Sequence, residues 1–439
     1  MTISKMVEDI INKELTSQQL VAQYIEKIKE NSHLNAVIEI NPDAMDIAKK
    51  LDEAAEKHGA LHGIPILVKD NINTGDKMQT TAGSLSLEGN IAEKDADAVE
   101  LLRKSGAVIL GKANMTEFAN YMVDSQLGAP MPNGYSSRGG QTVSTFGADV
   151  DTSGSSSGSA VAVAAELCAA AVGSETFGSI ISPSQRSGIV GIKPTDGLIS
   201  KRGVIPISFT LDTPGPMASC VEDTGVLLGA LAEKHFACTP RTDLRVGLCR
   251  AGIDKANPWL EANEKLVFLM QELGMDCVEL PDHGIDTAFV GPIMRHEFRH
   301  GINSYLQAAN NPALPQDLDA IIAYNEAHAE KALKYGQSRI LAANGIPSNW
   351  NEQPEYLEAL AARKAAIETL NNIFDTYSLD VILMLSANCG LAAATGFPSL
   401  TLRIGTTSEG LPIGTCLIAR PYHEETLLSI GLSIESALR

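Results

Sequence analysis

The most informative segment of this chain is Gly154-Ser155-Ser156-Ser157-Gly158-Ser159, and a second turn of similar composition follows at Gly173-Ser174-Glu175-Thr176-Phe177-Gly178-Ser179. Glycine and serine this dense beside a core helix predict backbone amides close to a reacting atom and hydroxyls placed to react. Upstream, a lone lysine, Lys69, follows the apolar run Gly63–Val68. A lysine in apolar surroundings can lose its proton near neutrality and act as a base. Together these features predict acyl transfer by a serine without a histidine.

Alternating strands and helices around these turns predict an α/β fold. The run between the turns, Ala160–Val172, consists of small apolar residues broken only by Glu166, and it predicts a helix that is buried on nearly every side. Upstream, Gly63–Val68 predicts a short strand, 95–105 a helix and Ala107–Leu110 the next strand.

The rest of the chain continues this alternation. Residues 115–158 are rich in Gly, Ser, Asn and Pro, and a long irregular stretch inside a compact domain is typically functional or disordered. Elsewhere the pattern predicts helices at 5–31, 42–57, 258–274, 292–308, 317–343 and 355–376, strands at 244–250 and Val381–Leu385, and a hairpin of Pro398–Ile404 with Pro412–Ala419. Because repeats and a clear linker are missing from the sequence, one large domain is favoured over several.

Composition narrows the class of protein. Among 439 residues, Lys and Arg number 34 and Asp and Glu number 53, which gives a net charge of −19. This charge disfavours binding to nucleic acids and to anionic membranes. The seven cysteines are scattered without a C-x-x-C pair, and no uncharged apolar run reaches about 18 residues. We therefore expect a cytoplasmic protein with reduced thiols and with neither nucleic acid nor membrane as a partner. A homodimer is compatible with the sequence.

The order and spacing of these motifs resemble those of the amidase signature family, hydrolases that use a serine–serine–lysine triad. The first turn resembles the family's Gly/Ser signature and the second its nucleophile turn, with Ser155 and Ser179 separated by 24 residues as in that pattern. Further matching segments span nearly the whole chain: Leu34–Ile38, His62–Ile72, Met78–Ser84, Gly111–Phe118, Gly191–Thr195, Asp212–Pro216 and Gly410–Gly414. Two more, Gly134–Thr142 and Ile205–Phe209, are similar to the bacterial peptide-amidase branch.

The resemblance implies an α/β/α sandwich in which helices cover a central mixed β-sheet. It also implies a single amidase domain over residues 1–439, with the signature core at about 60–235 and a more helical, variable portion at about 255–376. The middle and C-terminal portions are shorter than in many family members, so we expect a more open pocket wall.

The resemblance also assigns a catalytic triad, with Ser179 as the nucleophile, Ser155 as the bridging serine and Lys69 as the base. Physical chemistry supports these roles, because an unassisted serine is a weak nucleophile and needs an adjacent base. A neutral amine accepts a proton, and a hydroxyl can donate and accept at once, so Ser155 can relay a proton between the other two. In the family the bridging serine follows a cis peptide bond, which implies one at Gly154–Ser155.

The implied oxyanion hole consists of the backbone amides of Thr176, Phe177, Gly178 and Ser179. Two positions depart from the family pattern. Many members have glycine where Phe177 stands, the peptide-amidase branch commonly has aspartate there, and much of the family has arginine in place of Ile181. We expect the ring of Phe177 to narrow or cap the acyl pocket. Asn120 falls where a peptide-amidase substrate contact would lie.

These assignments predict an amidase that cleaves the C–N bond of a carboxamide through an acyl-Ser179 intermediate, without a cofactor or a metal. The expected substrate is a peptide amide or a small amide. One alternative is a glutamine amidotransferase subunit that acts with a partner, although Phe177, Ile181 and the run Arg138–Thr142 argue against it. The other is a catalytically inactive amide-binding homologue, in which Phe177 occludes the site.

Two further motifs suggest other chemistry and carry less weight. The run His296-Glu297-Phe298-Arg299-His300 matches the zinc pattern H-E-x-x-H, with Glu326 as a distant third ligand. The same helix is similar to one that holds no metal in the peptide-amidase branch. Gly154–Gly158 matches the G-x-S-x-G elbow of α/β-hydrolases, but the late histidine would have to be His423 and Lys69 would be left without a role.

Overall fold

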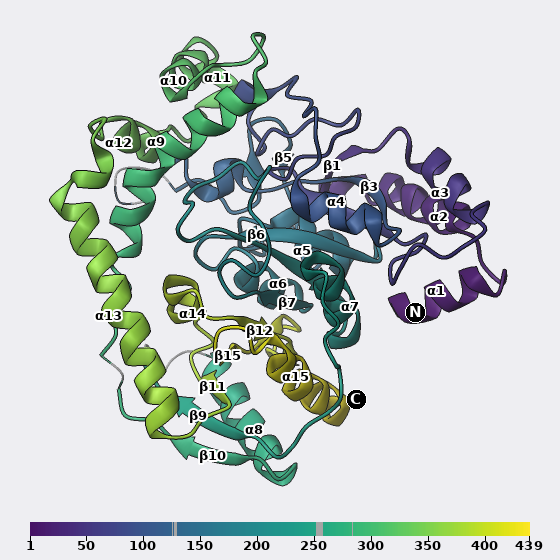
Figure 1. Ribbon diagram of the computed structural model, residues 1–439, viewed down its shortest axis with the longest axis vertical. Helices are drawn as coiled ribbons and strands as arrows, with labels where there is room; N and C mark the ends of the chain where they lie inside the picture. Colours follow the sequence, from purple (N-terminus) through teal and green to yellow (C-terminus); the bar gives the residue numbers. More distant parts are fainter. Residues whose placement is uncertain (125, 127–129, 252–257, 283) are drawn as a thin grey trace.

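A mixed β-sheet forms the centre of the molecule (Figure 1). The computed structural model describes residues 1–124, 126, 130–251, 258–282 and 284–439. Within these residues, eleven strands form one sheet in the order β1-β3-β2-β6-β8-β7-β12-β15-β11-β9-β10. The strands are β1 Val37–Ile40, β2 Pro65–Lys69, β3 Val108–Ala113, β6 Ala170–Glu175, β7 Val190–Lys193, β8 Thr213–Ala218, β9 Arg245–Cys249, β10 Asp276–Glu279, β11 Val381–Met384, β12 Ser399–Thr401 and β15 Leu417–Ala419.

The sheet is mixed, with parallel pairs towards both edges and antiparallel pairs through its centre. β2 runs parallel to β3 and β6, whereas β8 runs antiparallel to β6 and β7. Towards the other edge, β9 runs parallel to β10 and β11, whereas β15 runs antiparallel to β11 and β12. Two small ribbons pair β4 (Tyr135–Ser136) with β5 (Gly140–Gln141) and β13 (Arg403–Thr406) with β14 (Pro412–Gly414). The predicted mixed sheet is therefore confirmed.

Helices occur throughout the chain between the strands. Their bounds are α1 Ile3–Ile11, α2 Ser17–Glu30, α3 Ala44–Asp52, α4 Asp97–Lys104, α5 Ser157–Ala164, α6 Ile181–Ser187, α7 Val221–Ala232, α8 Pro258–Glu272, α9 Val290–Ala309, α10 Leu318–Ala327, α11 Ala329–Ala332, α12 Ser338–Asn344, α13 Pro354–Thr376, α14 Gly390–Thr395 and α15 Glu424–Leu438. None of those among the described residues is both long and apolar enough to cross a bilayer.

These helices cover both faces of the sheet, because neighbouring residues of a strand point to opposite faces. In β2, Ile66 and Val68 pack in one core with α1, α4, α7 and α15, whereas Leu67 packs in another with α2, α3 and α5. In β11, Leu383 belongs to the first core and Met384 to a further core with α13 and α14. The predicted three-layer α/β/α arrangement is confirmed.

The predicted helix Ala160–Val172 is wrong over its second half. Helix α5 ends at Ala164, and Ala170 already begins the buried strand β6. A short run of Ala and Val fits a fully buried strand as well as a buried helix, since neither has polar residues that mark a period. Glu166 lies in the turn between the two elements with φ +54°.

Two other predicted helices are divided. The segment 5–31 contains α1 and α2, and the side chain of Thr16 caps the second of them. The segment 317–343 contains α10, α11 and α12, and the helix predicted at 42–57 ends at Asp52. The predicted hairpin forms, with β12 and β13 pairing with β15 and β14.

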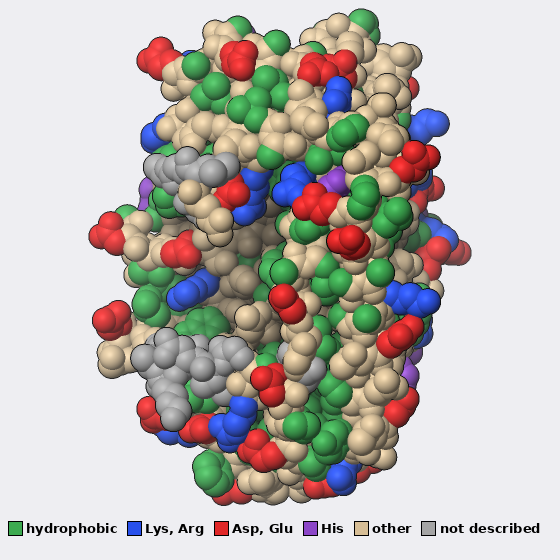
Figure 2. Space-filling model, turned by 90° about the vertical axis from the view of Figure 1, so that its left-hand side faces the viewer, with side chains coloured by type: hydrophobic (Ala, Val, Ile, Leu, Met, Phe, Trp, Pro, Cys, Tyr) green, Lys and Arg blue, Asp and Glu red, His purple; other side chains and the backbone are tan. Residues whose placement is uncertain are grey.

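Helices α9 and α13 form one side of the molecule. Figure 1 shows α13 along one edge with α9 beside its upper end, and the two helices pack together. Phe298 and Ile302 of α9 pack against Phe118, in the 3₁₀ helix η3 (Glu117–Asn120), and against Ile205, in the loop before β8. The molecular face on this side mixes acidic and basic side chains and is hollowed near its centre (Figure 2). This helical side therefore borders the loops in which the predicted site residues lie.

Candidate active site

The predicted base, Lys69, is the last residue of β2 and is fully buried. Its Nζ lies 2.7 Å from Oγ of Ser155 and 3.0 Å from both the carbonyl oxygen and Oγ of Ser174. Burial lowers the pKa of Lys69 to about 7, although the charges of Asp212 and Glu175 oppose this shift. A large fraction of the amine is therefore unprotonated near neutral pH, as a base requires.

The two serine-rich turns lie against each other. The Gly154–Ser155 peptide bond is cis. Ser156 Oγ donates a hydrogen bond to the carbonyl oxygen of Ser174 at 3.1 Å and accepts one from its amide at 3.2 Å. The Ser156 amide donates to the carbonyl oxygen of Ser179 at 3.2 Å. Ser156 therefore holds the two turns together, whereas its neighbour Ser155 contacts Lys69.

A buried glutamate, Glu175, shapes the turn that carries Ser179. Its Oε2 accepts hydrogen bonds from the amides of Ile180 at 2.7 Å and Ile181 at 3.0 Å, where α6 begins. Burial raises the pKa of Glu175, and these amides partly offset the rise. Gly178 takes φ +92°, a conformation that favours glycine. Ser179 therefore lies at the sharp turn between β6 and α6.

Ser179 opens onto a cavity of about 460 Å³. Among the described residues, its hydroxyl has no hydrogen-bond partner, so the oxygen is free to meet a ligand. Lys69 and Ser155 lie behind this cavity and are fully buried. The residues that line it are Ala119, Asn120, Tyr121, Gly154, Thr176, Phe177, Ser179, Ile207, Thr287, Ala288, Val290, Gly291, Met294 and Arg339.

Phe177 and Asn120, the two predicted substrate contacts, both line this cavity. Phe177 is 41% exposed, and its Cζ lies 3.1 Å from the position that a Cβ on Gly390 would take. Asn120 ends the 3₁₀ helix η3 (Glu117–Asn120) with φ +70°, and its carbonyl oxygen accepts a hydrogen bond from Arg339 at 3.2 Å. With the phenyl ring in this place the cavity beside Ser179 remains open.

The carboxylate of Asp212 stabilises the turn Thr176–Ser179 through hydrogen bonds, a role that the sequence did not indicate. Its Oδ1 accepts a hydrogen bond from Thr176 Oγ1 at 2.5 Å. Its Oδ2 accepts hydrogen bonds from the backbone amides of Ile207 at 2.9 Å and Ser208 at 3.0 Å. Burial raises the pKa of Asp212 to about 6, against the opposing effect of these hydrogen bonds. One carboxylate thus joins the turn of Ser179 to the loop before β8.

A second set of buried charges supports the end of β2. Asp70 accepts a hydrogen bond from the Gly83 amide at 2.9 Å and lies 3.7 Å from the guanidinium of Arg138. Lys112 on β3 is fully buried, and burial lowers its pKa to about 8. Asp70 follows Lys69 directly in the sequence, but no spacing along the chain indicates that Lys112 and Arg138 gather beside it.

The histidine pattern on α9 takes part in packing. His296 is buried, its Nδ1 lies 2.8 Å from the carbonyl oxygen of Pro292, and its ring stacks on Tyr356. His300 lies against the ring of Trp350. Across the described part of the chain, His, Cys, Asp and Glu side chains form no group that could hold a metal ion.

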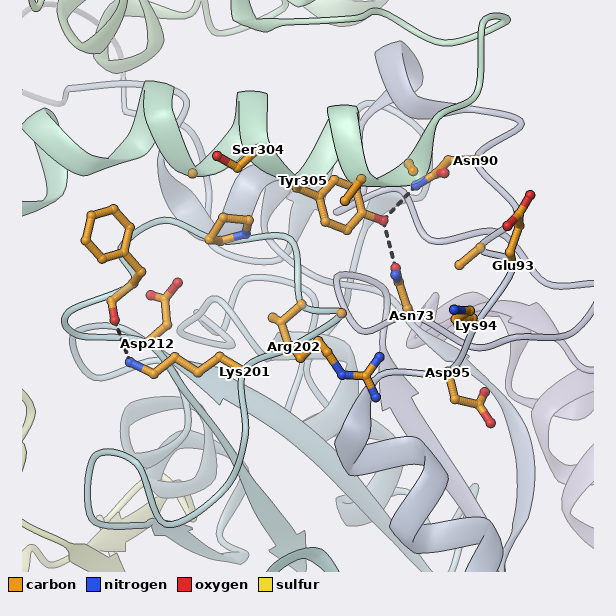
Figure 3. A pocket seen from close by; sticks show the side chains of 18 of the residues that line it. Asn73, Asn90, Glu93, Lys94, Asp95, Lys201, Arg202, Asp212, Ser304 and Tyr305 are labelled. Carbon is orange, nitrogen blue, oxygen red and sulfur yellow. Dashed lines mark hydrogen bonds between the residues drawn. The ribbon is translucent and has the colours of Figure 1, made fainter. Parts of the chain in front are cut away.

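A second, larger cavity has a volume of about 650 Å³ (Figure 3). Asp212 lines this larger cavity, and its hydrogen-bond partner Thr176 lines the Ser179 cavity, so the two cavities are neighbours. Figure 3 shows the Tyr305 hydroxyl between Asn73 and Asn90, with hydrogen bonds of 2.7 and 2.9 Å. Of the described residues that line this cavity, none belongs to the predicted triad. The smaller cavity is therefore the candidate active site.

Comparisons with known proteins agree with this architecture. A family model described as amidase matches residues 19–390. A protein of Arabidopsis thaliana named as a probable amidase is 34% identical over 457 residues, which cover 97% of this chain and 87% of that protein. The X-ray structure of native peptide amidase from Stenotrophomonas maltophilia has a TM-score of 0.90 and 32% identity, and the match covers 100% of this chain and 97% of the other. A glutamyl-tRNA(Gln) amidotransferase subunit of Caldanaerobacter subterraneus is 27% identical over 487 residues, which cover 100% of this chain and 96% of that protein.

Proposed function

Because this chain belongs to the amidase family, we propose that it hydrolyses carboxamides with Ser179 as the nucleophile. The observation that carries the proposal is the 2.7 Å contact between Lys69 Nζ and Ser155 Oγ behind an accessible Ser179 hydroxyl. A base with a pKa of about 7 suits proton transfer at neutral pH.

In the proposed reaction, neutral Lys69 accepts the proton of Ser155 while Ser155 accepts the proton of Ser179, whose oxygen attacks the carboxamide carbon. The former carbonyl oxygen then carries the negative charge of the tetrahedral intermediate. Collapse of the intermediate breaks the C–N bond, and the proton on Lys69 returns through Ser155 to the leaving amine. A water molecule repeats the sequence on the acyl–Ser179 ester and releases the acid.

The proposed oxyanion hole is the turn Thr176–Ser179. Among the described residues, the amides of Phe177 and Ser179 donate to no protein acceptor, which supports their role as donors to the oxyanion. The amide of Gly178 interacts with the Glu175 carboxylate and lowers its pKa. We therefore expect Phe177 and Ser179 to contribute most of the stabilisation.

The proposed substrate is a small amide or a peptide amide, and the similarity to the Stenotrophomonas peptide amidase supports this class. The open cavity at Ser179 favours an active enzyme over an inactive amide-binding homologue. The amidotransferase alternative draws on the Caldanaerobacter relative at 27% identity and requires a partner. The family substitutions at Phe177 and Ile181 count against it.

Labelling with a fluorophosphonate, followed by a screen of amides and peptide amides, tests the proposal. We expect the label on Ser179, amide turnover by the purified chain alone, and loss of both in Ser179→Ala. Ser304→Ala, at an exposed serine of the second cavity, is the matched control and should keep both. Label on another serine would contradict the nucleophile assignment. The absence of labelling would favour the inactive homologue, and turnover only after addition of a second protein would favour the amidotransferase.

A further inference from the structure

Arg339 is the only charged side chain among the described residues that line the Ser179 cavity. It lies at the start of α12 and is half-buried. Its Nη1 donates one hydrogen bond, to the carbonyl oxygen of Asn120 at 3.2 Å, and its guanidinium lies 5.8 Å from the ring centroid of Tyr121. A guanidinium has five N–H donors, so most of its donor capacity remains unused.

Among the described residues, Arg339 is one of three arginines, with Arg186 and Arg403, that form no ion pair, and of the three only Arg339 lines the Ser179 cavity. Eleven other arginines of the described chain form ion pairs with carboxylates: Arg103, Arg138, Arg202, Arg241, Arg245, Arg250, Arg295, Arg299, Arg363, Arg420 and Arg439. Within the same residues Arg339 forms none, although the chain carries 53 acidic residues. A half-buried cation beside a cavity without acidic lining attracts an anionic ligand.

The backbone at the start of α9 adds to the positive electrostatic potential in the Ser179 cavity. Thr287, Ala288, Val290 and Gly291 line the cavity at the N-terminal end of α9, where the helix dipole is positive. Two aspartates, Asp124 and Asp286, are close in sequence to residues that line the Ser179 cavity. Asp286 is exposed and accepts a hydrogen bond from the Ala288 amide, and Asp124 accepts one from the Gln126 amide. Neither carboxylate lines the cavity.

We propose that Arg339 binds a carboxylate of the substrate, so that the preferred substrates are carboxamides that also carry a free carboxylate away from the scissile bond. The proposal rests on the hydrolysis at Ser179 proposed above and adds the class of substrate. The guanidinium would meet the carboxylate in the cavity while the amide carbon lies against Ser179. An interaction of this kind combines a charge-assisted hydrogen bond with planar, two-point geometry.

A pair of isosteric amides tests this assignment. Glutaramate carries a terminal carboxylate, whereas 5-methylhexanamide carries an isopropyl group of the same shape. We expect the wild-type kcat/KM to favour glutaramate, and Arg339→Gln to lower it about 10- to 100-fold for glutaramate while changing it less than about twofold for 5-methylhexanamide. Arg339→Lys should restore part of the loss. Arg295→Gln, at an arginine of α9 that pairs with Glu355, is the matched control and should change neither value.

Protection of Ser179 from fluorophosphonate gives a readout that needs no turnover. Linear dicarboxylates from malonate to adipate stand for the acid product, and at least one should slow labelling of the wild type but not of Arg339→Gln. Equal losses for both amides in Arg339→Gln would overturn the proposal and leave Arg339 as a support for the Asn120 loop. Lack of protection by every dicarboxylate would overturn it as well. If Ser179 takes no label at all, the proposed hydrolysis fails rather than the carboxylate site alone.

Discussion

Thr176 Oγ1 lies 2.5 Å from Asp212 Oδ1, and this hydrogen bond joins the turn of Ser179 to the loop between the two cavities. The same loop is anchored on its far side by Glu297 of α9, which accepts hydrogen bonds from the side chains of Ser208 and Thr210. The geometry of the proposed oxyanion turn therefore depends on α9, more than eighty residues later in the sequence.

Asp212→Asn and Thr176→Val test the charge of Asp212 and the hydrogen bond that it accepts. The Asp212 charge raises the pKa of Lys69, so Asp212→Asn should move the acid limb of the pH–rate profile to lower pH. Thr176→Val removes a hydrogen bond that lowers the pKa of Asp212, so it should lower kcat by about tenfold and, because Asp212 then loses part of its charge near pH 7, shift the limb in the same direction as Asp212→Asn but by less. Profiles of kcat/KM from pH 5 to about 9 measure both. A limb that stays in place in Asp212→Asn would contradict the electrostatic explanation.

The pH dependence of the wild type should follow Lys69. Its pKa is lowered to about 7 by burial, so the amine is neutral and competent above this pH and protonated below it. We expect kcat/KM to fall as the pH drops through about 7. Lys69→Ala should lose most activity, and Lys69→Arg should not regain it, because a guanidinium stays protonated. Rates like the wild type in Lys69→Arg would exclude a proton-accepting role.

Neighbouring serines of the two turns should respond differently to alanine. Ser179→Ala should abolish turnover with little change in melting temperature, since its hydroxyl has no partner among the described residues. Ser156→Ala removes two buried hydrogen bonds to Ser174 and should reduce the free energy of unfolding by about 1–3 kcal/mol. Thermal melts and trapping of the acyl-enzyme for mass spectrometry measure these outcomes. Acylation found on Ser155 or Ser156 would refute the assignment of Ser179.

The sequence was sufficient where the structure depends on local pattern. The apolar run before Lys69 forms the buried strand β2, and Gly178 takes φ +92° in the turn before Ser179. Lys69 and Ser155, predicted to cooperate, are in contact. The strand and the turn are encoded within a few consecutive residues, by hydrophobic period or by the freedom of glycine, whereas the contact between Lys69 and Ser155 was predicted from the resemblance to the amidase signature family.

What could not be predicted depends on contacts between distant segments. Asp212 and Glu175 are single carboxylates inside recognised motifs, and no period along the chain indicates which amides they will accept. Arg339 meets Asn120 across more than two hundred residues. The boundary between α5 and β6 was missed for another reason, because a run of small apolar residues is compatible with both elements until its neighbours select one.

Activity should be independent of metal. The ring of His296 stacks on Tyr356 and the ring of His300 packs against Trp350, so a chelator should leave kcat/KM unchanged and His300→Ala should keep most activity. Elemental analysis of the purified protein and assays with and without a chelator measure this. Loss of activity in chelator that is recovered by zinc would bring the H-E-x-x-H interpretation forward again.

Phe177 should control the size of the acyl group. Its ring lines the Ser179 cavity and lies close enough to Gly390 that a Cβ there would be only 3.1 Å from Cζ. Phe177→Gly should therefore widen acceptance towards bulky amides, since one misfit methylene costs about 1–3 kcal/mol in a tight pocket. Some loss of rate is expected as well, because an added glycine loosens the turn that supplies the oxyanion amides.

A matched control distinguishes the effect of the Phe177 ring in the Ser179 cavity from the effect of removing any half-exposed aromatic ring. Phe209 is 43% exposed, close to the 41% of Phe177, but it lines the second cavity. The ratio of kcat/KM for a bulky peptide amide to that for a short aliphatic amide should rise in Phe177→Gly and stay constant in Phe209→Gly. Gly390→Ala should act in the opposite direction, because its new methyl group would push the phenyl ring towards the cavity. A ratio that stays constant in Phe177→Gly would show that the ring does not limit the acyl group, and its conformation would then need an explanation from packing against α14.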